Sequence, residues 1–272
     1  LRSSSAASDV YKRQICTGGE PWTEKPWKWL FQVIGKSKVP IMNSAGGTEV
    51  SGSILHCCLH RPFKVGSFNA PIPGMSADIL NLDGKKVSTN EMGELVMRKS
   101  SIGLTKSLWN DDKRYIDNYW SVIKDYWVHG DLASRDADGH WYLHGRSDDT
   151  IKVSGKRIGP SELESVIVKS GKAKEVAAVG IPDENKGSKI ILSIVPAENN
   201  DQKESFFEDL VIKDLGKSFK PDKVIFVKDL PKTRNMKIMR RVIKSCLANQ
   251  DPGDLSTLLN PESVEEIRSH AI

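Results

Sequence analysis

The sequence predicts an α/β fold with a β-rich subdomain, followed by a small α+β domain. Three observations lead to this prediction. Two short apolar runs each break into glycine and polar residues, first in "ICTGGEP" from Ile15 and then in "VPIMNSAGGTEVSG" from Val39. Residues 64–146 carry the alternation and turn residues of antiparallel β structure. From residue 149 onward, strand-like and helix-like segments follow one another.

The two apolar runs predict neighbouring strands in the first part of the chain. Between them, "PWTEKPWKWLFQVIG" predicts a helix that ends at Gly35. The second run, from Val39 to Met42, gives way to small residues with Thr48 and Glu49 at the tip. Strand ends with polar tips are typical of an α/β sheet that presents a site along one edge.

The middle section predicts hairpins. "MSADILNLDGKKVS" predicts a strand pair around an Asp83-Gly84 turn, and "GELVMRK" predicts a further strand. "DADGHWYLHGR" predicts another hairpin.

The last part predicts a compact domain of about 100 residues, which is large enough to fold alone. Its helix at "PSELESVIVKSG" starts at Pro160, places Leu163, Val166 and Ile167 on one face, and stops at Gly171. The expected order is strand "TIKVSG", this helix, strand "EVAAVGI", strand "KIILSIV", helix "ESFFEDLVIKDLG", strand "DKVIFVKDL" and helix "KIMRRVIKSCL".

Composition narrows the class of protein. With 38% hydrophobic and 28% charged residues, the 272-residue chain is expected to fold into globular domains. No stretch approaches the roughly 18 consecutive apolar residues of a membrane helix, so a soluble chain is expected. The four cysteines show no metal-binding spacing and suit a reducing cytoplasm. Residues 1–14 lack any periodicity and are expected to be disordered or foreign to the fold.

Positive charge is concentrated near the C-terminus. Between Lys213 and Lys244 lie eleven Lys or Arg residues against three acidic residues, within a net charge of +5. Such a face suits a nucleic acid or a phosphorylated small molecule, and a plain solvated surface is the alternative. For a nucleic acid, the segment holds few aromatic residues for base stacking, namely Phe219 and Phe226.

The segment "HGRSDDTIKVSGKRIGP", residues 144–160, lies at the junction of the two expected domains. Its glycines and polar residues suit a hinge, because hinges are usually a few residues at the ends of elements. A fixed solvated linker is the alternative.

Five motifs occur in order along the chain: "GGEP", "GGTE", "WVHGD", "GRSDDTIKVSGKRIGPSELE" and "PKTRNMKIMRR". Together they resemble the later motifs of the AMP-forming acyl-CoA synthetases, above all the acetyl-CoA synthetases and related short-chain acyl ligases. The resemblance extends from Ile15 to about Asn249. It implies a cytoplasmic ligase that joins a carboxylate to ATP, forms an acyl-adenylate and pyrophosphate, and transfers the acyl group to CoA with Mg²⁺ as cofactor. No nucleic-acid or membrane partner is implied.

The resemblance also implies domain boundaries and site residues. The large domain would occupy residues 15–147, the small mobile domain 148–250 and a C-terminal tail 251–272. In the large domain, Asp131 would bind the ribose hydroxyls, Thr48 the α-phosphate and Glu49 the Mg²⁺. The remaining ATP-binding residues implied there are Gly19, Glu20, Pro21, Asn43, Ser44, Ala45, Gly46 and Gly47.

In the small domain, Lys237 matches the lysine that enters the site for adenylation. Arg157 would contact the α-phosphate, Arg146 at the end of the large domain would contact ribose and phosphate, and Asp148 matches the family's hinge. Ser154 and Gly155 would border the CoA channel.

Three departures from the family pattern stand out. Asn235 and Met236 replace the usual Ser-Gly before the lysine, so a stiffer loop is expected. Ile212 falls where the acetyl-CoA synthetases have a basic CoA contact, which leaves Lys213 as a neighbouring candidate. The family's phosphate loop is absent, so the chain is expected to be the C-terminal part of a longer protein and inactive alone.

Gly46 stands where acetyl-CoA synthetases carry a tryptophan that closes the acyl pocket. The expected substrate is therefore a C3–C5 acid, which could be hydroxylated. The alternatives are acetate itself, an adenylation domain that serves a carrier protein, and a nucleic-acid-binding module.

Overall fold

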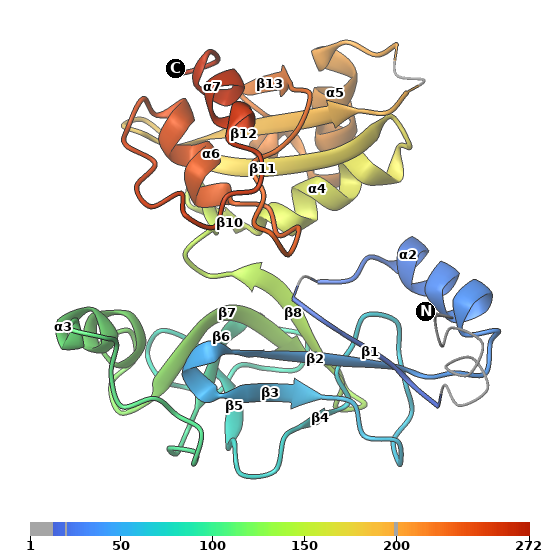
Figure 1. Cartoon of the computed structure of the whole chain (residues 1–272), viewed down its shortest axis with the longest axis vertical. Coiled ribbons are helices and arrows are strands. Elements are labelled where there is room, and N and C mark those ends of the chain that lie inside the picture. Colours follow the sequence, from blue (N-terminus) through green and yellow to red (C-terminus); the bar gives the residue numbers. More distant parts are fainter. Residues whose placement is uncertain (1–12, 20, 199–200) are drawn as a thin grey trace, which may run out of the picture. The chain divides into compact units, whose positions relative to one another are not determined.

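The computed structural model describes residues 13–19, 21–198 and 201–272. The chain forms two compact units, of which the first ends at His144 and the second begins at Gly145 (Figure 1). The division therefore falls three residues before the position expected from the sequence. The expectation for residues 1–14 concerns a segment that lies, up to residue 12, outside the described residues.

The first part of unit 1 forms a mixed four-stranded sheet. Strand β1 (Ile15–Gly18) runs parallel to β2 (Ile41–Gly47), as the two apolar runs predict. The connection between them contains α2 (Glu24–Trp29) and a π-helical turn, η1 (Leu30–Ile34), which ends at Gly35 as expected. Strand β2 then pairs antiparallel with β3 (Gly52–His56), which pairs with β4 (Ala70–Pro71).

Residues Asn43–Thr48, which the resemblance matches to a nucleotide-contacting loop of the family, are mostly strand. Strand β2 continues to Gly47, and only Thr48–Val50 turns, as the 3₁₀ segment η2. The strand continues because β3 pairs with it closely. A Cβ on Gly46 would lie 2.0 Å from the carbonyl oxygen of Gly52, an approach that no larger residue permits in this backbone.

The second sheet confirms antiparallel structure in the middle section, but the strand pair expected around Asp83-Gly84 is reduced to a single bridge between Leu80 and Lys86, and β5 pairs with β6. Its strands β5 (Ala77–Leu80), β6 (Gly93–Met97), β7 (Trp127–Arg135) and β8 (Trp141–Arg146) lie in that order. The β-rich section is not continuous, because α3 (Asp112–Tyr115) and the π-helical η3 (Ile116–Trp120) interrupt it. Asp111 caps α3 by accepting a hydrogen bond from the amide of Arg114.

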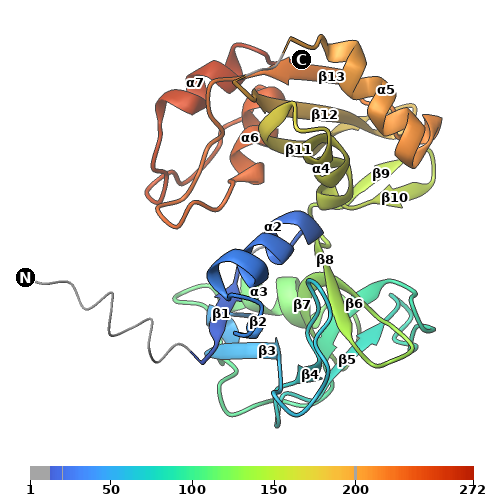
Figure 2. The same ribbon diagram turned by 90° about the vertical axis from the view of Figure 1, so that its right-hand side faces the viewer.

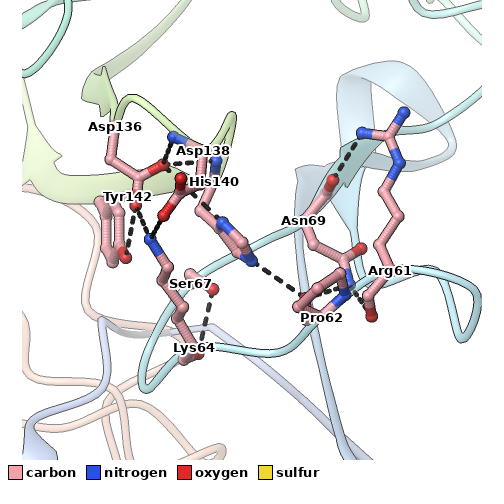
Figure 3. Close-up of polar contacts among 9 residues, drawn as sticks. All are labelled: Arg61, Pro62, Lys64, Ser67, Asn69, Asp136, Asp138, His140 and Tyr142. Carbon is pink, nitrogen blue, oxygen red and sulfur yellow. Dashed lines mark hydrogen bonds and ion pairs between the residues drawn. The ribbon is translucent and has the colours of Figure 1, made fainter.

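A polar cluster ties the loop after β3 to the turn between β7 and β8 (Figure 3). Lys64 Nζ lies 2.6 Å from a carboxylate oxygen of Asp136 and 2.6 Å from one of Asp138. Asp136 also accepts hydrogen bonds from the amides of Asp138 and His140 and from the Tyr142 hydroxyl. The cluster fixes an otherwise irregular loop to the second sheet.

Unit 2 begins with a small hairpin of β9 (Ile151–Val153) and β10 (Lys156–Ile158). Its three-stranded sheet has the order β11-β12-β13, with β11 and β12 antiparallel and β12 and β13 parallel. The remaining elements are α4 (Pro160–Lys169), β11 (Ala173–Asp183), β12 (Gly187–Pro196), α5 (Glu204–Leu215), η4 (Lys217–Phe219), β13 (Lys223–Phe226), α6 (Arg240–Leu247) and α7 (Glu262–Arg268).

Helices cover both faces of this sheet (Figures 1 and 2). Helices α4 and α5 pack on one face and α6 and α7 on the other. Successive residues of a strand point to opposite faces, so Ala178 joins the first core and Ala177 the second. The expected helix "KIMRRVIKSCL" begins only at Arg240.

The segment 251–272, expected to be a separate tail, belongs to unit 2 in the structure. Helix α7 places Val264 and Ile267 in the core beside α6, where both are buried. None of the helices in the part of the chain that the structure describes has the length and apolar character that crossing a bilayer requires.

Candidate active site

The parallel pair β1 and β2 forms the first part of the candidate site. The register places Thr17 beside Asn43 and Gly18 beside Ser44. Thr17 Oγ1 donates to Asn43 Oδ1 at 3.2 Å, and Asn43 Nδ2 donates to the Gly66 carbonyl at 3.4 Å. The Asn43 side chain is 2% exposed, so it joins the strands to a neighbouring loop. Ser44 Oγ likewise donates to the Thr17 carbonyl.

Gly19 and Pro21 follow β1 and are exposed, and Glu20 between them lies outside the described residues. Gly19 has a φ of +108°, a conformation that glycine adopts without strain. A Cβ built there would meet no atom within 4 Å, so the backbone dihedral, and not crowding, requires glycine. The edge at Gly19 is therefore open to a ligand approaching the backbone.

Glu49 lies in η2, two residues after the end of β2, and is held by two contacts from the segment 105–119. Its Oε1 accepts a hydrogen bond from the Tyr119 hydroxyl at 3.1 Å, and its carbonyl accepts one from the amide of Thr105 at 2.7 Å. A Cβ on Gly47 would lie 2.9 Å from Glu49 Oε2 and 3.3 Å from His129 Cε1. Glycine at 47 thus lets this carboxylate and imidazole lie against β2.

Asp131 reaches the same region from β7. The pairing of β6 with β7 shifts register between Glu94 and Val96, and Gly130 has a φ of +83°. This bulge separates His129 from Asp131, whose Oδ2 lies 3.3 Å from His129 Nε2. The structure therefore brings Glu49 and Asp131, which are far apart in the sequence, into the neighbourhood of one imidazole, that of His129.

Aromatic stacking supports this cluster. Tyr119, which donates to Glu49, stacks on Trp127 with ring centroids 5.2 Å apart and planes 1° apart. Trp127 in turn lies 5.6 Å from the His129 ring. Tyr119 and His129 were not singled out from the sequence. The glycine after His129 in "WVHGD" is the sequence signal that marks the bulge.

The carboxylate oxygens of Glu49 are suitable ligands for a hard cation such as Mg²⁺. Mg²⁺ is usually bound by one or two carboxylates together with phosphate oxygens of a substrate. Over the described ranges, no group of three or more His, Cys, Asp or Glu side chains could hold a metal by itself. A Mg²⁺ at Glu49 would thus depend on ligands from a bound nucleotide.

In unit 2, Arg146 and Asp148 form an ion pair, with Nε and Oδ1 3.1 Å apart. The amide of Thr150 donates to the Ser147 carbonyl, so residues 147–150 form a turn. Within this turn, burial raises the pKa of Asp149, the nearby Asp148 carboxylate raises it further, and Arg240 and Arg146 oppose the shift. Two adjacent aspartates in one turn therefore meet different environments.

Ser154 and Gly155 form the two-residue turn of the β9–β10 hairpin. Their φ angles are +49° and +79°, and both residues are exposed. The Ser154 amide donates to the Lys186 carbonyl at 2.8 Å. Arg157 lies opposite Lys152 in the hairpin register and is exposed.

Lys237 lies on a closed turn between β13 and α6. The Thr233 amide donates to the Lys237 carbonyl at 2.9 Å, and the Lys237 amide donates to Thr233 Oγ1 at 3.2 Å. Met236 has a φ of +64°, and the bridge between Lys232 and Ile238 closes the base. This turn, residues 232–238, is called the lysine hairpin below. It delays the start of α6 to Arg240 and leaves Lys237 exposed.

The basic segment gives no support for base stacking by its aromatic residues. Phe219 and Phe226 are partly buried and pack against the core formed by α4, α5 and the sheet. Aromatic rings that stack on nucleic-acid bases must present a face to the ligand.

Unit 1 is thus an α/β unit with carboxylates gathered at a strand end, and unit 2 is a layered α+β domain that presents a lysine. Residues 3–109 match the family described as "AMP-binding enzyme", and residues 162–237 match "AMP-binding enzyme C-terminal domain". Together the two matches take up more than half of the chain, in the order of the two units. The chain belongs to the AMP-binding enzyme family, which confirms the resemblance.

Curated relatives agree with this membership. An acetyl-coenzyme A synthetase of Methanothrix thermoacetophila is 37% identical over 262 residues, with 94% of this chain and 40% of the relative covered. One of Pasteurella multocida is 36% identical over 267 residues, with 94% and 41% covered. The chain therefore spans about 40% of the length of these relatives.

Solved structures share the fold. An acetoacetyl-CoA synthetase from Streptomyces lividans superposes with a TM-score of 0.81 at 22% identity, over 94% of this chain and 40% of that one. An anthranilate CoA ligase, AuaEII, in complex with anthranoyl-AMP gives a TM-score of 0.69 at 26% identity, over 84% and 43%. The predicted fold class, α/β followed by a small α+β domain, is confirmed. The roles of individual site residues stay predictions.

Proposed function

We propose that this chain takes part in the ATP-dependent, AMP-forming activation of a short-chain carboxylic acid to its CoA thioester, through an acyl-adenylate. It would do so within a polypeptide of its relatives' length, since it spans about 40% of them. The observation that best supports the proposal is Lys237, an exposed ammonium on a hydrogen-bonded hairpin, within a family of AMP-binding enzymes. An ammonium beside the α-phosphate and the attacking carboxylate offsets charge that builds up in the transition state.

In unit 1, the residues at the strand ends would hold the nucleotide. Asp131 accepts hydrogen bonds from two ribose hydroxyls, for which its carboxylate has enough acceptor sites. Contact with His129 keeps this carboxylate in place. Thr48, exposed at the start of η2, donates to the α-phosphate. The open backbone at Gly19 lies against the adenine.

Mg²⁺ fits beside Glu49, whose carboxylate the Tyr119 hydroxyl orients. When bound, the ion would neutralise phosphate charge. The same hydrogen bond restricts the rotamer of Glu49 before the nucleotide arrives.

In unit 2, Arg146 and Arg157 would contact ribose and phosphate through guanidinium groups that suit oxyanions. Ser154 and Gly155 border the path of CoA, and their small side chains leave room for its pantetheine arm. Asp148 is the hinge about which the small unit changes orientation between adenylation and thioester formation.

The proposed substrate is longer than acetate, a C3–C5 acid or a hydroxy acid, with acetate as the alternative because the named relatives are acetyl-coenzyme A synthetases. Under the family resemblance, Gly46 stands where acetyl-CoA synthetases carry an indole, and the absence of this indole would enlarge the acyl pocket. A Cβ at Gly46 would collide with the β3 backbone, so Gly46→Trp would disturb strand pairing as well as pocket size. A comparison of kcat/KM across acetate, propionate, butyrate and their terminal hydroxy acids avoids this problem. Each methylene that fits is worth about 1–3 kcal/mol, so acetate as the best substrate would contradict the proposal.

The activity itself is tested with Lys237→Ala in a polypeptide of the relatives' length that contains this sequence. The rate of acyl-adenylate formation, measured as the release of pyrophosphate, should fall by about 100-fold or more. Thioester formation from supplied acyl-adenylate and CoA should remain within a few-fold of the unmodified rate. Lys228→Ala, an exposed lysine outside the hairpin, is the matched control. Equal losses of rate in both half-reactions would contradict a specific role of Lys237 in adenylation.

A further inference from the structure

The lysine hairpin is anchored by a buried ammonium at its base. Lys232 is 5% exposed, and its Nζ lies 2.6 Å from Glu175 Oε2 and 2.6 Å from Asp229 Oδ1. Burial lowers the pKa of this ammonium, but the hydrogen bonds to Asp229 and Glu175 outweigh it, so the pKa is raised and Lys232 is charged. A buried charge needs such partners, so the position of Lys232 is strongly restricted.

The C-terminal segment completes this anchor through Asn260. Asn260 is 7% exposed, and its Oδ1 accepts a hydrogen bond from the Lys232 amide at 3.0 Å. Its Nδ2 donates to Asp229 Oδ2 at 2.7 Å and to the Leu230 carbonyl at 2.8 Å. One amide side chain thus binds the backbone of Lys232 and the carboxylate that neutralises its ammonium.

Backbone pairing extends the same contact toward Lys237. The Leu259 amide donates to the Lys232 carbonyl at 2.8 Å, and Thr233 forms a bridge with Leu258. Thr233 is the residue whose amide and hydroxyl hold the backbone of Lys237. A continuous series of contacts therefore leads from Asn260, through Lys232 and Thr233, to Lys237.

A two-stranded hairpin is marginally stable by itself in water. Here Met236 also occupies the left-handed region, which costs a non-glycine residue free energy. The hairpin therefore keeps its shape because neighbouring segments hold its base. On the side of residues 258–260, the contacts come from a segment that joins the core through α7.

We propose that Asn260 is a positioning residue for Lys237: through Lys232 and Thr233 it sets the place of the lysine hairpin, and it touches no substrate. The inference rests on the proposed adenylation role of Lys237. Residues 258–260 would then hold the lysine hairpin in the position that adenylation requires. A displacement of about 1 Å at a reacting group is enough to cost about 100-fold in rate.

The test compares Asn260→Ala and Asn260→Asp with the control Asn185→Ala, which makes the same change on the exposed turn between β11 and β12. In a polypeptide of the relatives' length, Asn260→Ala should lower kcat for adenylation by about 10- to 100-fold with the KM for ATP nearly unchanged. Thioester formation from supplied acyl-adenylate should stay within about 3-fold. Asn260→Asp keeps the acceptor for the Lys232 amide but places a carboxylate oxygen against the Asp229 carboxylate and the Leu230 carbonyl, so it should lose at least as much adenylation activity as Asn260→Ala.

Hydrogen exchange on the present chain gives a readout that does not depend on activity. In Asn260→Ala, the amides of Thr233, Met236 and Lys237 should exchange at least about 10-fold faster, with the amides of α5 unchanged. Faster exchange throughout unit 2, or equal losses in both half-reactions, would make Asn260 merely structural and overturn the proposal. If Lys237→Ala leaves adenylation intact while hairpin exchange still rises in Asn260→Ala, the assigned role of Lys237 fails and the anchoring stands.

Discussion

Arg240 and Glu164 form a two-point ion pair, with Nε 2.9 Å from Oε1 and Nη2 2.8 Å from Oε2. Their side chains are 14% and 12% exposed, and Oε1 of Glu164 also accepts the amide of Ala178. The pair therefore joins α4, β11 and the first residue of α6. Because α6 follows the lysine hairpin directly, this contact holds the C-terminal side of the hairpin's base near Ile238, whereas Asn260 holds the N-terminal side at Lys232.

Glu164→Gln should destabilise unit 2 by about 3 kcal/mol. The substitution leaves the guanidinium of Arg240 buried beside a neutral amide, and the loss of one partner of a buried pair is strongly unfavourable. All seven tryptophans precede Gly145, so fluorescence reports only on unit 1, and the measurement must be hydrogen exchange of amides in α4 and α5. Asp201→Asn breaks an exposed pair with Lys172 and should cost much less than Glu164→Gln. Equal effects of the two changes would contradict the prediction.

Asp149→Asn should stabilise unit 2 at neutral pH. Burial and the Asp148 carboxylate raise the pKa of Asp149 in the folded state above its ordinary 3.8, so the folded state holds this proton more tightly than the unfolded state does. Ionisation of Asp149 therefore lowers the stability of unit 2 as the pH rises above the ordinary pKa of 3.8. The asparagine of the variant stays neutral and removes this loss. The gain should disappear below about pH 4, where both states are protonated. Asp148→Asn is the exposed control, and a gain independent of pH would argue against the electrostatic cause.

Asp136→Asn should lower the free energy of unfolding of unit 1 by about 1–3 kcal/mol, because Asp136 accepts from Lys64 and from two backbone amides. Burial opposes its ionisation, but hydrogen bonds from Lys64 and the His140 amide lower its pKa from 3.8 to about 2. The stabilisation by the Asp136 carboxylate is thus complete when the pH is above the ordinary pKa of 3.8, and it is lost as the pH falls through about 2. Tryptophan fluorescence during urea unfolding at several pH values measures it. Asp138→Asn, at an exposed carboxylate of the same cluster, should change stability by less than about 1 kcal/mol.

Met236→Gly should stabilise the folded lysine hairpin only slightly while making it more mobile. The present φ of +64° costs a non-glycine residue about 1–2 kcal/mol, and the greater freedom of glycine in the unfolded chain cancels about half of that. A change in melting temperature of more than about 5 °C in either direction would contradict this balance. Faster exchange of the Lys237 amide in the variant would support the expectation that Asn235 and Met236 make a stiff loop.

The sequence predicted those elements whose pattern is local. In unit 2, apolar residues alternate to both faces of the sheet, and Pro160 and Gly171 mark the two ends of a helix, so the order of elements could be predicted. The segment 251–272 could not, because its proline, glycine and aspartate residues suggest a loop, and its burial comes from packing against α6. The extension of β2 through Asn43–Gly47 depends on β3, whose pairing no local pattern shows.

The candidate site was predictable as motifs but not as contacts. Glu49 and Asp131 could be singled out by their motifs, yet their common neighbour His129 follows from a bulge in β7. Tyr119 is separated from Glu49 by 70 positions, and such long-range hydrogen bonds leave no trace in local periodicity. The contacts of the buried Asn43 side chain with Thr17 and the Gly66 carbonyl were not foreseeable from the motif, and its contact with a nucleotide stays a prediction.

Asp148→Pro tests the proposed hinge, and the local geometry makes the substitution well suited to that purpose. Asp148 is the second residue of the 147–150 turn, a position where proline is common because its φ is fixed near −65°. The chain should therefore fold, while rotation about this φ is lost. If the small unit must adopt two orientations, one half-reaction should remain within a few-fold and the other should fall by about 10-fold or more. Asp148→Ala removes the ion pair with Arg146 without fixing φ, so its effect on the two half-reactions isolates the loss of charge. Normal rates in both half-reactions of Asp148→Pro would show that residues 147–150 act only as a linker.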